Sequence, residues 1–286
     1  MKLIMIHGRG QVGKDPAVLK KEWLDALSYG LARAEKTLPP GTTVEFPFYG
    51  DTLETLLGQL NTPLAIDGAA RGTESDVENQ LRGEILEDLA AAMGVTQADI
   101  AREFAGQPLE RGPANWGWVQ AILRAVDRVP GVNSAAIDAF TRDVYVYLSY
   151  PGVRARIDRV VSAAFTDEPC VVLAHSLGTV VAYNVLLTRA AMPPVTRFIT
   201  VGSPLGIRGI KRHLATPLRS PTAVGNWFNA YDERDVVALV ALDASGFDVT
   251  PPIENKSNVL NFTDNRHGIA GYLADPVVAA RIAEYL

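Results

Sequence analysis

The stretch CVVLAHSLGTVVAYNVLL, residues 170–187, decides the fold. A run of apolar and β-branched residues leads into AHSLG, residues 174–178, and an apolar helical pattern follows at once. Strand, sharp turn and helix in this order form the context in which a G-x-S-x-G motif presents a nucleophilic serine. Gly178 is the small residue that lets the helix approach the strand, and Ala174 stands in place of the motif's first glycine.

Two interpretations of Ser176 follow from this pattern. In the first, the tight turn holds a strained backbone and presents the hydroxyl at the carboxyl end of a sheet, beside the free N–H groups of a helix N-terminus. In the second, Ser176 only caps a helix that follows a buried strand. The small residues on both sides and the adjacent His175 favour the first interpretation.

Strand-like and helix-like segments alternate through much of the chain. Strands are predicted at Leu3–Ile6, Val44–Phe48, Cys170–Ala174, Phe198–Val201, Trp227–Ala230 and Val259–Phe262. Strands that alternate with helices form parallel sheets covered on both faces. The sequence therefore predicts an α/β fold with a mostly parallel sheet flanked by helices.

The alternation fails in the middle of the chain. Residues 51–141 read as several helices, and polar segments such as 67–76 and the acidic 73–78 are predicted to be loops. We therefore expect a core of residues 1–50 and 142–286, with 51–141 inserted as a helical cap or lid. Apolar residues recur there at helical spacing, as in Trp116, Val119 and Leu123. Such a stripe predicts a packed face, and a lid wall that binds an acyl chain is the further hypothesis.

Composition excludes several classes of protein. The 286 residues carry a formal net charge of −5 and no basic run, which argues against a nucleic-acid partner. No stretch approaches the ~18 apolar residues of a membrane span, and the N-terminal apolar run is too short for a signal peptide. The single cysteine excludes an intrachain disulfide. We expect a cytoplasmic protein, with signal-independent export as the alternative. No metal-ligand spacing is present and no cofactor is implied.

Residues 170–187 resemble the nucleophile region of the α/β-hydrolase family, particularly its lipase and serine-esterase branches. Some members of those branches carry alanine at the first motif position. The resemblance covers about residues 3–50 and 154–286 and does not extend to the middle insertion. It implies an α/β-hydrolase fold and a catalytic Ser176 that is followed along the chain by an acid and then a histidine.

The resemblance also implies the partners of the serine. Of the four histidines, only His213 and His267 follow Ser176, and only His267 leaves room for an acid in between. His267 would be the general base. Asp235 begins a D-x-V-A sequence that resembles the family's D-x-V-P, so it is the implied acid, and Asp232 is the alternative.

An early glycine-rich loop, GRGQVGKD at residues 8–15, admits more than one function. It fits G-x-G-x-x-G and most of a phosphate-binding P-loop, but Asp15 stands where that loop needs Ser or Thr. By the resemblance, the His-Gly pair at 7–8 opens an oxyanion loop. The oxyanion donors would then be the N–H groups of Arg9 and Leu177. Phosphate or nucleotide binding at Gly8–Lys14 remains the less favoured alternative.

A GSP sequence, residues 202–204, follows the next predicted strand. In lipase-like members such a sequence shapes the pocket floor. The resemblance therefore implies pocket-shaping roles for His7, Gly8, His175, Gly202 and Ser203. The predicted function is a serine hydrolase that cleaves a small-molecule or lipid-like carboxylic ester through an acyl-enzyme. A catalytically silent fold that binds a partner is the alternative from another class.

Overall fold

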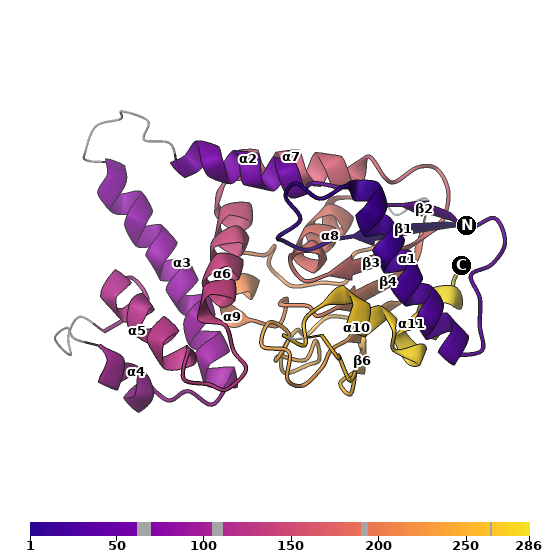
Figure 1. Cartoon of the computed structure of the whole chain (residues 1–286). Coiled ribbons are helices and arrows are strands. Elements are labelled where there is room, and N and C mark those ends of the chain that lie inside the picture. Colours follow the sequence, from indigo (N-terminus) through magenta and orange to yellow (C-terminus); the bar gives the residue numbers. More distant parts are fainter. Residues whose placement is uncertain (62–69, 105–110, 190–193, 264) are drawn as a thin grey trace. The chain divides into compact units, whose positions relative to one another are not determined.

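Parallel strands form the centre of the fold. The computed structural model describes residues 1–61, 70–104, 111–189, 194–263 and 265–286. Within them, one parallel sheet runs in the order β2-β1-β3-β4-β5-β6 (Figure 1). The strands are β1 (Lys2–Ile6), β2 (Thr43–Glu45), β3 (Cys170–His175), β4 (Val195–Val201), β5 (Trp227–Ala230) and β6 (Glu254–Lys256). The predicted α/β class with a parallel sheet is confirmed.

The register of the strands sets where their loops gather. Every residue of β1 and β3 is buried, as expected for strands covered on both faces. Ile6 pairs with Ala174, and Ala174 pairs with Thr200, so β1, β3 and β4 end at one level. The segments that follow these strands therefore begin at the same edge of the sheet.

Helices cover both faces of the sheet. In Figure 1, α1 (Pro16–Arg33), α10 (Ile269–Leu273) and α11 (Pro276–Ala283) lie in front of the strands, and α8 (Leu177–Thr188) lies behind them. A further helix, α7, spans Pro151–Ser162. Asp15 caps α1 by accepting the N–H groups of Ala17 and Val18. Residues 177–186 of α8 are all buried, which explains why its sequence is apolar all round.

The prediction of a strand at Val259–Phe262 is wrong. Strand β6 lies earlier, at Glu254–Lys256, and is polar. In the segment 259–262 alternate side chains are buried and exposed, as in a strand, because Val259 and Asn261 point inward. The N–H of Asn261, however, donates to the carboxylate of Asp232 at 2.9 Å and not to a neighbouring strand. Residues 259–262 therefore alternate in side-chain burial but do not form a strand of the sheet.

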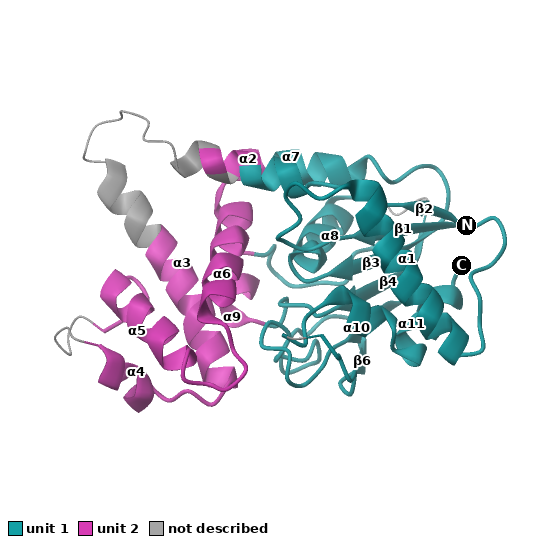
Figure 2. Cartoon of the chain, viewed as in Figure 1, with its two compact units in different colours: residues 1–54, 154–206, 214–286 teal, residues 55–153, 207–213 magenta. Residues whose placement is uncertain are grey.

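The chain divides into two compact units (Figure 2). The first comprises residues 1–54, 154–206 and 214–286, and the second comprises 55–153 and 207–213. Helix α2 (Gly50–Asn61) is divided between them. The described residues of the second unit contain α3 (Ala70–Ala92), α4 (Gln97–Glu103), α5 (Trp116–Val126), α6 (Ser134–Ser149) and α9 (Arg208–Lys211).

Helix α3 begins earlier than the sequence predicts. Residues 70–78 are helical, so the loops predicted over 67–76 and 73–78 are wrong from Ala70 onward, and 67–69 lie outside the described residues. Residues 70–78 include Gly72, Thr73 and Asp76, which are weak helix formers, so local propensity does not predict this helical start.

Helix α3 organises the second unit by packing against α5, α6 and α9. Asp88 on α3 accepts the N–H of Gly209 and pairs with Arg208, both at 2.9 Å. On α5, Val119 is buried as its spacing predicts, but Trp116 is 43% exposed. The predicted apolar stripe is therefore packed over only part of its length.

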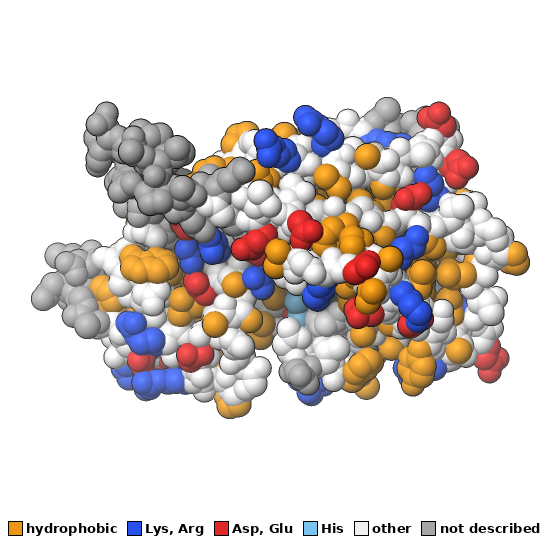
Figure 3. Space-filling view, turned by 45° about the horizontal axis from the view of Figure 1, so that its top comes forward, with side chains coloured by type: hydrophobic (Ala, Val, Ile, Leu, Met, Phe, Trp, Pro, Cys, Tyr) orange, Lys and Arg blue, Asp and Glu red, His pale blue; other side chains and the backbone are white. Residues whose placement is uncertain are grey.

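The surface mixes charges of both signs. Figure 3 shows acidic and basic side chains interspersed on the face in view. None of the helices in the described ranges combines the length and the apolar character that crossing a bilayer requires.

Candidate active site

Ser176 lies in the turn between β3 and α8. Its backbone has φ +56° and ψ −131°, a left-handed conformation that a residue with a Cβ rarely adopts. Its side chain makes no capping hydrogen bond to α8. Instead, its Oγ lies 2.8 Å from Nε2 of His267. The helix-cap interpretation of Ser176 therefore does not describe its side chain.

Two glycines allow the backbone to pack closely around this turn. A Cβ at Gly178 would lie 2.4 Å from the carbonyl oxygen of His7, so α8 reaches this position beside β1 only because the side chain is absent. A Cβ at Gly8 would lie 2.8 Å from Cβ of Ser176. Both distances are shorter than side chains tolerate. Gly8 thus brings the loop after β1 into contact with the serine.

His267 lies in the segment between β6 and α10. Its Nδ1 is 2.7 Å from Oδ2 of Asp235. Because a carboxylate only accepts hydrogen bonds, Nδ1 carries the proton of the neutral ring. Nε2 is then the acceptor and faces the hydroxyl hydrogen of Ser176. This is the tautomer that a general base requires.

Asp235 is fully buried, with no exposed side-chain area. Its Oδ1 accepts the N–H of Val237 at 3.0 Å. Oδ2 accepts both Nδ1–H of His267 at 2.7 Å and the hydroxyl of Tyr272 at 2.5 Å. None of the described Lys or Arg side chains comes within ion-pair distance of Asp235. Neutral donors alone satisfy this carboxylate.

Asp232, the alternative acid, has other partners. It accepts the N–H of Arg234 at 2.8 Å and that of Asn261 at 2.9 Å. The guanidinium groups of Arg234 and Arg266 lie 3.6 and 3.8 Å away. Of the two candidates, Asp235 contacts His267, whereas Asp232 fixes the segment that leads to it.

His175 contacts the backbone of His267. Its Nε2 lies 2.7 Å from the backbone carbonyl oxygen of His267, so Nε2 donates its proton to that oxygen. Burial, together with the adjacent His267, lowers the pKa of His175 well below its ordinary value. The ring therefore stays neutral and holds the backbone of His267 in place. The sequence predicted only that this residue shapes the pocket.

The ring of His7 fixes the start of the loop after β1. Its Nε2 accepts the N–H of Tyr49 at 3.1 Å, so Nδ1 carries the proton and donates to the carbonyl oxygen of Gly8 at 2.6 Å. Burial lowers the pKa of His7 to about 4, in keeping with a neutral ring. Because a peptide group is planar, a fixed Gly8 carbonyl also fixes the direction of the Arg9 N–H.

The two predicted oxyanion donors come from two segments of the chain that meet at the serine. Leu177 is the first residue of α8, where an N–H has no intrahelical acceptor. Arg9 follows Gly8, the residue in contact with Ser176. The side chain of Gln11 donates a hydrogen bond to the carbonyl oxygen of Arg9 at 2.8 Å, and this bond stabilises the loop.

The same loop offers little to a phosphate. The N–H of Gly13 donates to Oδ1 of Asp51 at 2.8 Å, and the N–H of Lys14 lies 3.2 Å from the carbonyl oxygen of Gln11. Asp15 occupies the first N–H groups of α1. Carboxylates therefore stand where a phosphate would have to bind, and their charge would repel it.

Two residues of the GSP sequence, Gly202 and Ser203, pack against different parts of the structure. Gly202 has φ +57°, and a Cβ there would lie 3.0 Å from the ring of Tyr272 and 3.2 Å from Oδ2 of Asp235. This glycine therefore makes room for Asp235 and Tyr272. Ser203 is buried, and its Oγ lies 2.9 Å from the hydroxyl of Thr179 on α8. Sequence reasoning missed Tyr272, whose position five residues after His267 is its only signal.

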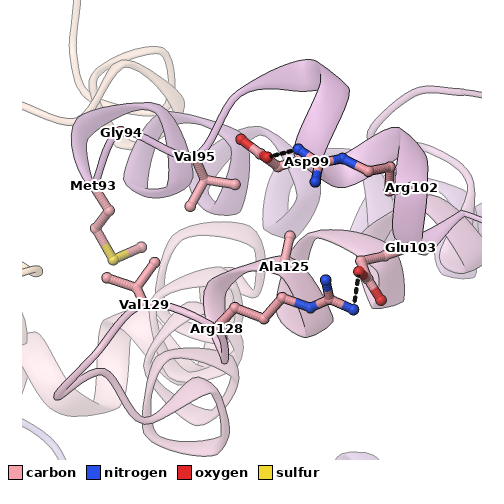
Figure 4. Close-up of a pocket in the computed structure, with 9 residues that line it drawn as sticks. All are labelled: Met93, Gly94, Val95, Asp99, Arg102, Glu103, Ala125, Arg128 and Val129. Atoms are coloured by element: carbon pink, nitrogen blue, oxygen red, sulfur yellow. Dashed lines mark hydrogen bonds and ion pairs between the residues drawn. The ribbon is translucent and has the colours of Figure 1, made fainter.

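A separate pocket of ≈ 210 Å³ lies within the second unit (Figure 4). Its charged side chains pair with one another: Arg102 with Asp99, and Arg128 with Glu103 at 2.5 Å. The lining residues are Met93, Gly94, Val95, Asp99, Arg102, Glu103, Ala125, Arg128 and Val129. None of these lining residues is a serine or a histidine.

Comparisons with family models, with curated proteins and with solved structures found no match to the chain. In the part of the chain that the structure describes, no three His, Cys, Asp or Glu side chains are grouped so that they could hold a metal ion. Function must therefore be inferred from the geometry around Ser176.

Proposed function

We propose that the chain is a serine hydrolase that cleaves carboxylic esters through an acyl-enzyme. One observation carries the proposal: Ser176 Oγ, His267 and Asp235 form a continuous chain of hydrogen bonds of 2.8 and 2.7 Å. The tautomer that these contacts require leaves Nε2 of His267 free to accept the serine proton. The strained backbone of Ser176 adds support, because such strain concentrates at functional sites.

The first half of the reaction uses these residues in order. Ser176 Oγ attacks the ester carbonyl carbon while Nε2 of His267 takes the hydroxyl proton. Asp235 holds the ring in place and stabilises the imidazolium that forms. The tetrahedral intermediate collapses, the bond from carbon to the alkoxy oxygen breaks, and His267 returns its proton to the leaving alcohol. The acyl group remains on Ser176 as an ester.

The second half repeats the chemistry with water. His267 takes a proton from a water molecule, whose oxygen attacks the acyl carbon. The bond from that carbon to Ser176 Oγ then breaks, His267 returns its proton to Oγ, and the carboxylic acid leaves. In both halves negative charge develops on the carbonyl oxygen. The N–H groups of Arg9 and Leu177 are the proposed donors to that oxygen. Donors of this kind contribute about 3 kcal/mol each to transition-state stabilisation.

The experiment is hydrolysis of p-nitrophenyl esters of graded acyl length, from acetate to palmitate, by the purified protein. We expect turnover with a preference for part of the series, and a loss of about 10⁴- to 10⁶-fold in Ser176→Ala. Ser162→Ala is the matched control, because Ser162 is an exposed serine at the end of α7. Its rate should equal that of the unmodified chain.

Two results would contradict the proposal. Hydrolysis that survives Ser176→Ala would assign the chemistry to another residue. A folded protein that hydrolyses no member of the series, and no thioester or amide analogue, would favour the partner-binding alternative.

A further inference from the structure

The hydroxyl of Tyr272 touches the acid of the proposed triad. Tyr272 lies on α10, five residues after His267, and its ring is fully buried. Its hydroxyl lies 2.5 Å from Oδ2 of Asp235 and accepts the N–H of Asp232 at 3.3 Å. Because an N–H donates to the hydroxyl oxygen and a carboxylate only accepts, the hydroxyl hydrogen points at Asp235.

Tyr272 and His267 therefore share one oxygen atom. Oδ2 of Asp235 accepts from both, while Oδ1 faces the N–H of Val237. Burial and the adjacent Asp235 raise the pKa of Tyr272 above its ordinary value, so its hydroxyl remains a proton donor at any working pH. This charge-assisted hydrogen bond draws negative charge from the oxygen that would stabilise a protonated His267.

We propose that Tyr272 is a positioning residue that tunes the base: by sharing Oδ2 of Asp235, it holds the carboxylate in place and makes His267 harder to protonate. This inference rests on the proposed function, since it assigns His267 the role of the base. The sign follows from charge. An oxygen with one donor fewer carries more negative charge toward the imidazole and favours its protonated form.

Other charged and titratable groups also face this cluster. His175 lies against the base, with 4.8 Å between the two ring centroids, and stays neutral. Asp232 lies beside Tyr272 and is itself faced by Arg234 and Arg266. Removing the Tyr272 hydroxyl takes one acceptor from the backbone N–H of Asp232, but the only ionisable side chain that loses a hydrogen bond among those described is Asp235. A shift that follows the removal therefore reports the shared oxygen of Asp235.

The test compares Tyr272→Phe with Tyr183→Phe. Tyr183 is also fully buried, and its hydroxyl donates to the carbonyl of Arg219 at 3.0 Å, so its removal costs a similar hydrogen bond outside the triad. The measurement is the pH dependence of kcat/KM for a p-nitrophenyl ester. In Tyr272→Phe, we expect the midpoint of the acidic limb to rise by about one pH unit. In Tyr183→Phe it should not move.

A second readout needs no turnover. The Cε1 proton of His267, assigned by its loss in His267→Gln, can be titrated by NMR in the free protein. Its midpoint should rise in Tyr272→Phe by the same amount as the acidic limb. A midpoint that stays in place or falls would overturn the role of Tyr272. A protein that hydrolyses no ester yet shows the NMR shift would overturn the proposed function alone.

Discussion

Two regions of the molecule hold carboxylates in opposite ways. In the first unit, Asp235 is fully buried and its partners are two neutral side chains and one backbone N–H. In the pocket of the second unit, Glu103 and Asp99 each pair with an arginine whose side chain is 68% exposed. The second arrangement neutralises charge at the surface, and the first keeps a negative charge inside the protein.

The difference shows which carboxylate can act on a neighbour. A buried charge is costly unless its hydrogen bonds compensate, and its field is weakly screened. Asp235 directs that field at one imidazole. In the two pairs of the second unit the arginine is mostly exposed to water, and ion pairs of this kind contribute about 1 kcal/mol or less.

The largest expected effect is at Asp235. Asp235→Asn should lower kcat on an activated ester by about 10⁴-fold with little loss of folding, because the amide disfavours the required tautomer of His267. Asp232→Asn should keep kcat within about tenfold. Its cost should instead be a loss of about 1–3 kcal/mol in the free energy of unfolding, since Asp232 anchors two backbone N–H groups.

Kinetics and urea unfolding of both variants check this pair. The reverse pattern, in which Asp232→Asn abolishes turnover and Asp235→Asn only destabilises, would transfer the role of the acid to Asp232. The burial and neutral partners of Asp235 would then not mark it as the carboxylate that acts on His267.

The next effect is the pH dependence of stability at His7. Its pKa is about 4 in the folded chain against an ordinary value of 6.5, so the unfolded chain binds a proton more readily between these values. The free energy of unfolding should therefore fall as the pH drops from about 6.5 toward 4, by about 3 kcal/mol from this residue at the lower limit. His175, whose pKa is also lowered, acts in the same direction.

Urea unfolding across this pH range provides the measurement. His7→Asn keeps a donor for the Gly8 carbonyl but cannot titrate, so its stability should vary less with pH. His213→Asn is the matched control, because His213 is exposed and belongs to the second unit. An unchanged pH dependence in His7→Asn would show that His7 is not a buried neutral ring.

A smaller effect is expected at Gly8. In Gly8→Ala the new Cβ would meet Cβ of Ser176 at 2.8 Å, so the loop or the serine must move. Overpacking of this kind costs about 1–3 kcal/mol, and kcat/KM should fall about 10- to 100-fold. Gly152→Ala, where the space is open, should leave turnover unchanged. Equal rates in both variants would mean that Gly8 does not approach the serine closely.

The smallest effect is expected in the pocket of the second unit. Arg128→Ala removes the ion pair between Arg128, whose side chain is 68% exposed, and Glu103. The free energy of unfolding should fall by about 1 kcal/mol or less, and ester hydrolysis should not change. A loss of free energy of unfolding several times larger would show that the pair of Arg128 and Glu103 contributes far more to stability than an exposed ion pair should.

The sequence predicted what local pattern controls. The α/β class, the strand before Ser176 and the helix after it follow from apolar runs and small residues. The structure brings His267 and Asp235 to Ser176, as the resemblance implied for these residues, and their roles stay a prediction. The resemblance favoured Asp235 and kept Asp232 as the alternative, because both lie in one short segment after β5 and their partners differ only in three dimensions.

Other features depend on contacts that no local pattern encodes. Val259–Phe262 alternates like a strand, yet a side-chain carboxylate takes the N–H of Asn261. Tyr272 carries no motif, and its hydroxyl matters only because the fold brings α10 to Asp235. The role of His175 likewise depends on a backbone carbonyl 92 residues away along the chain. Such partners become visible only in three dimensions.

The most direct test of the central claim is covalent labelling with a fluorophosphonate, read by intact mass and by peptide mapping. We expect one adduct per chain, located on Ser176, that disappears in Ser176→Ala and forms far more slowly in His267→Ala. Labelling that persists in Ser176→Ala, or an adduct mapped to another residue, would contradict it.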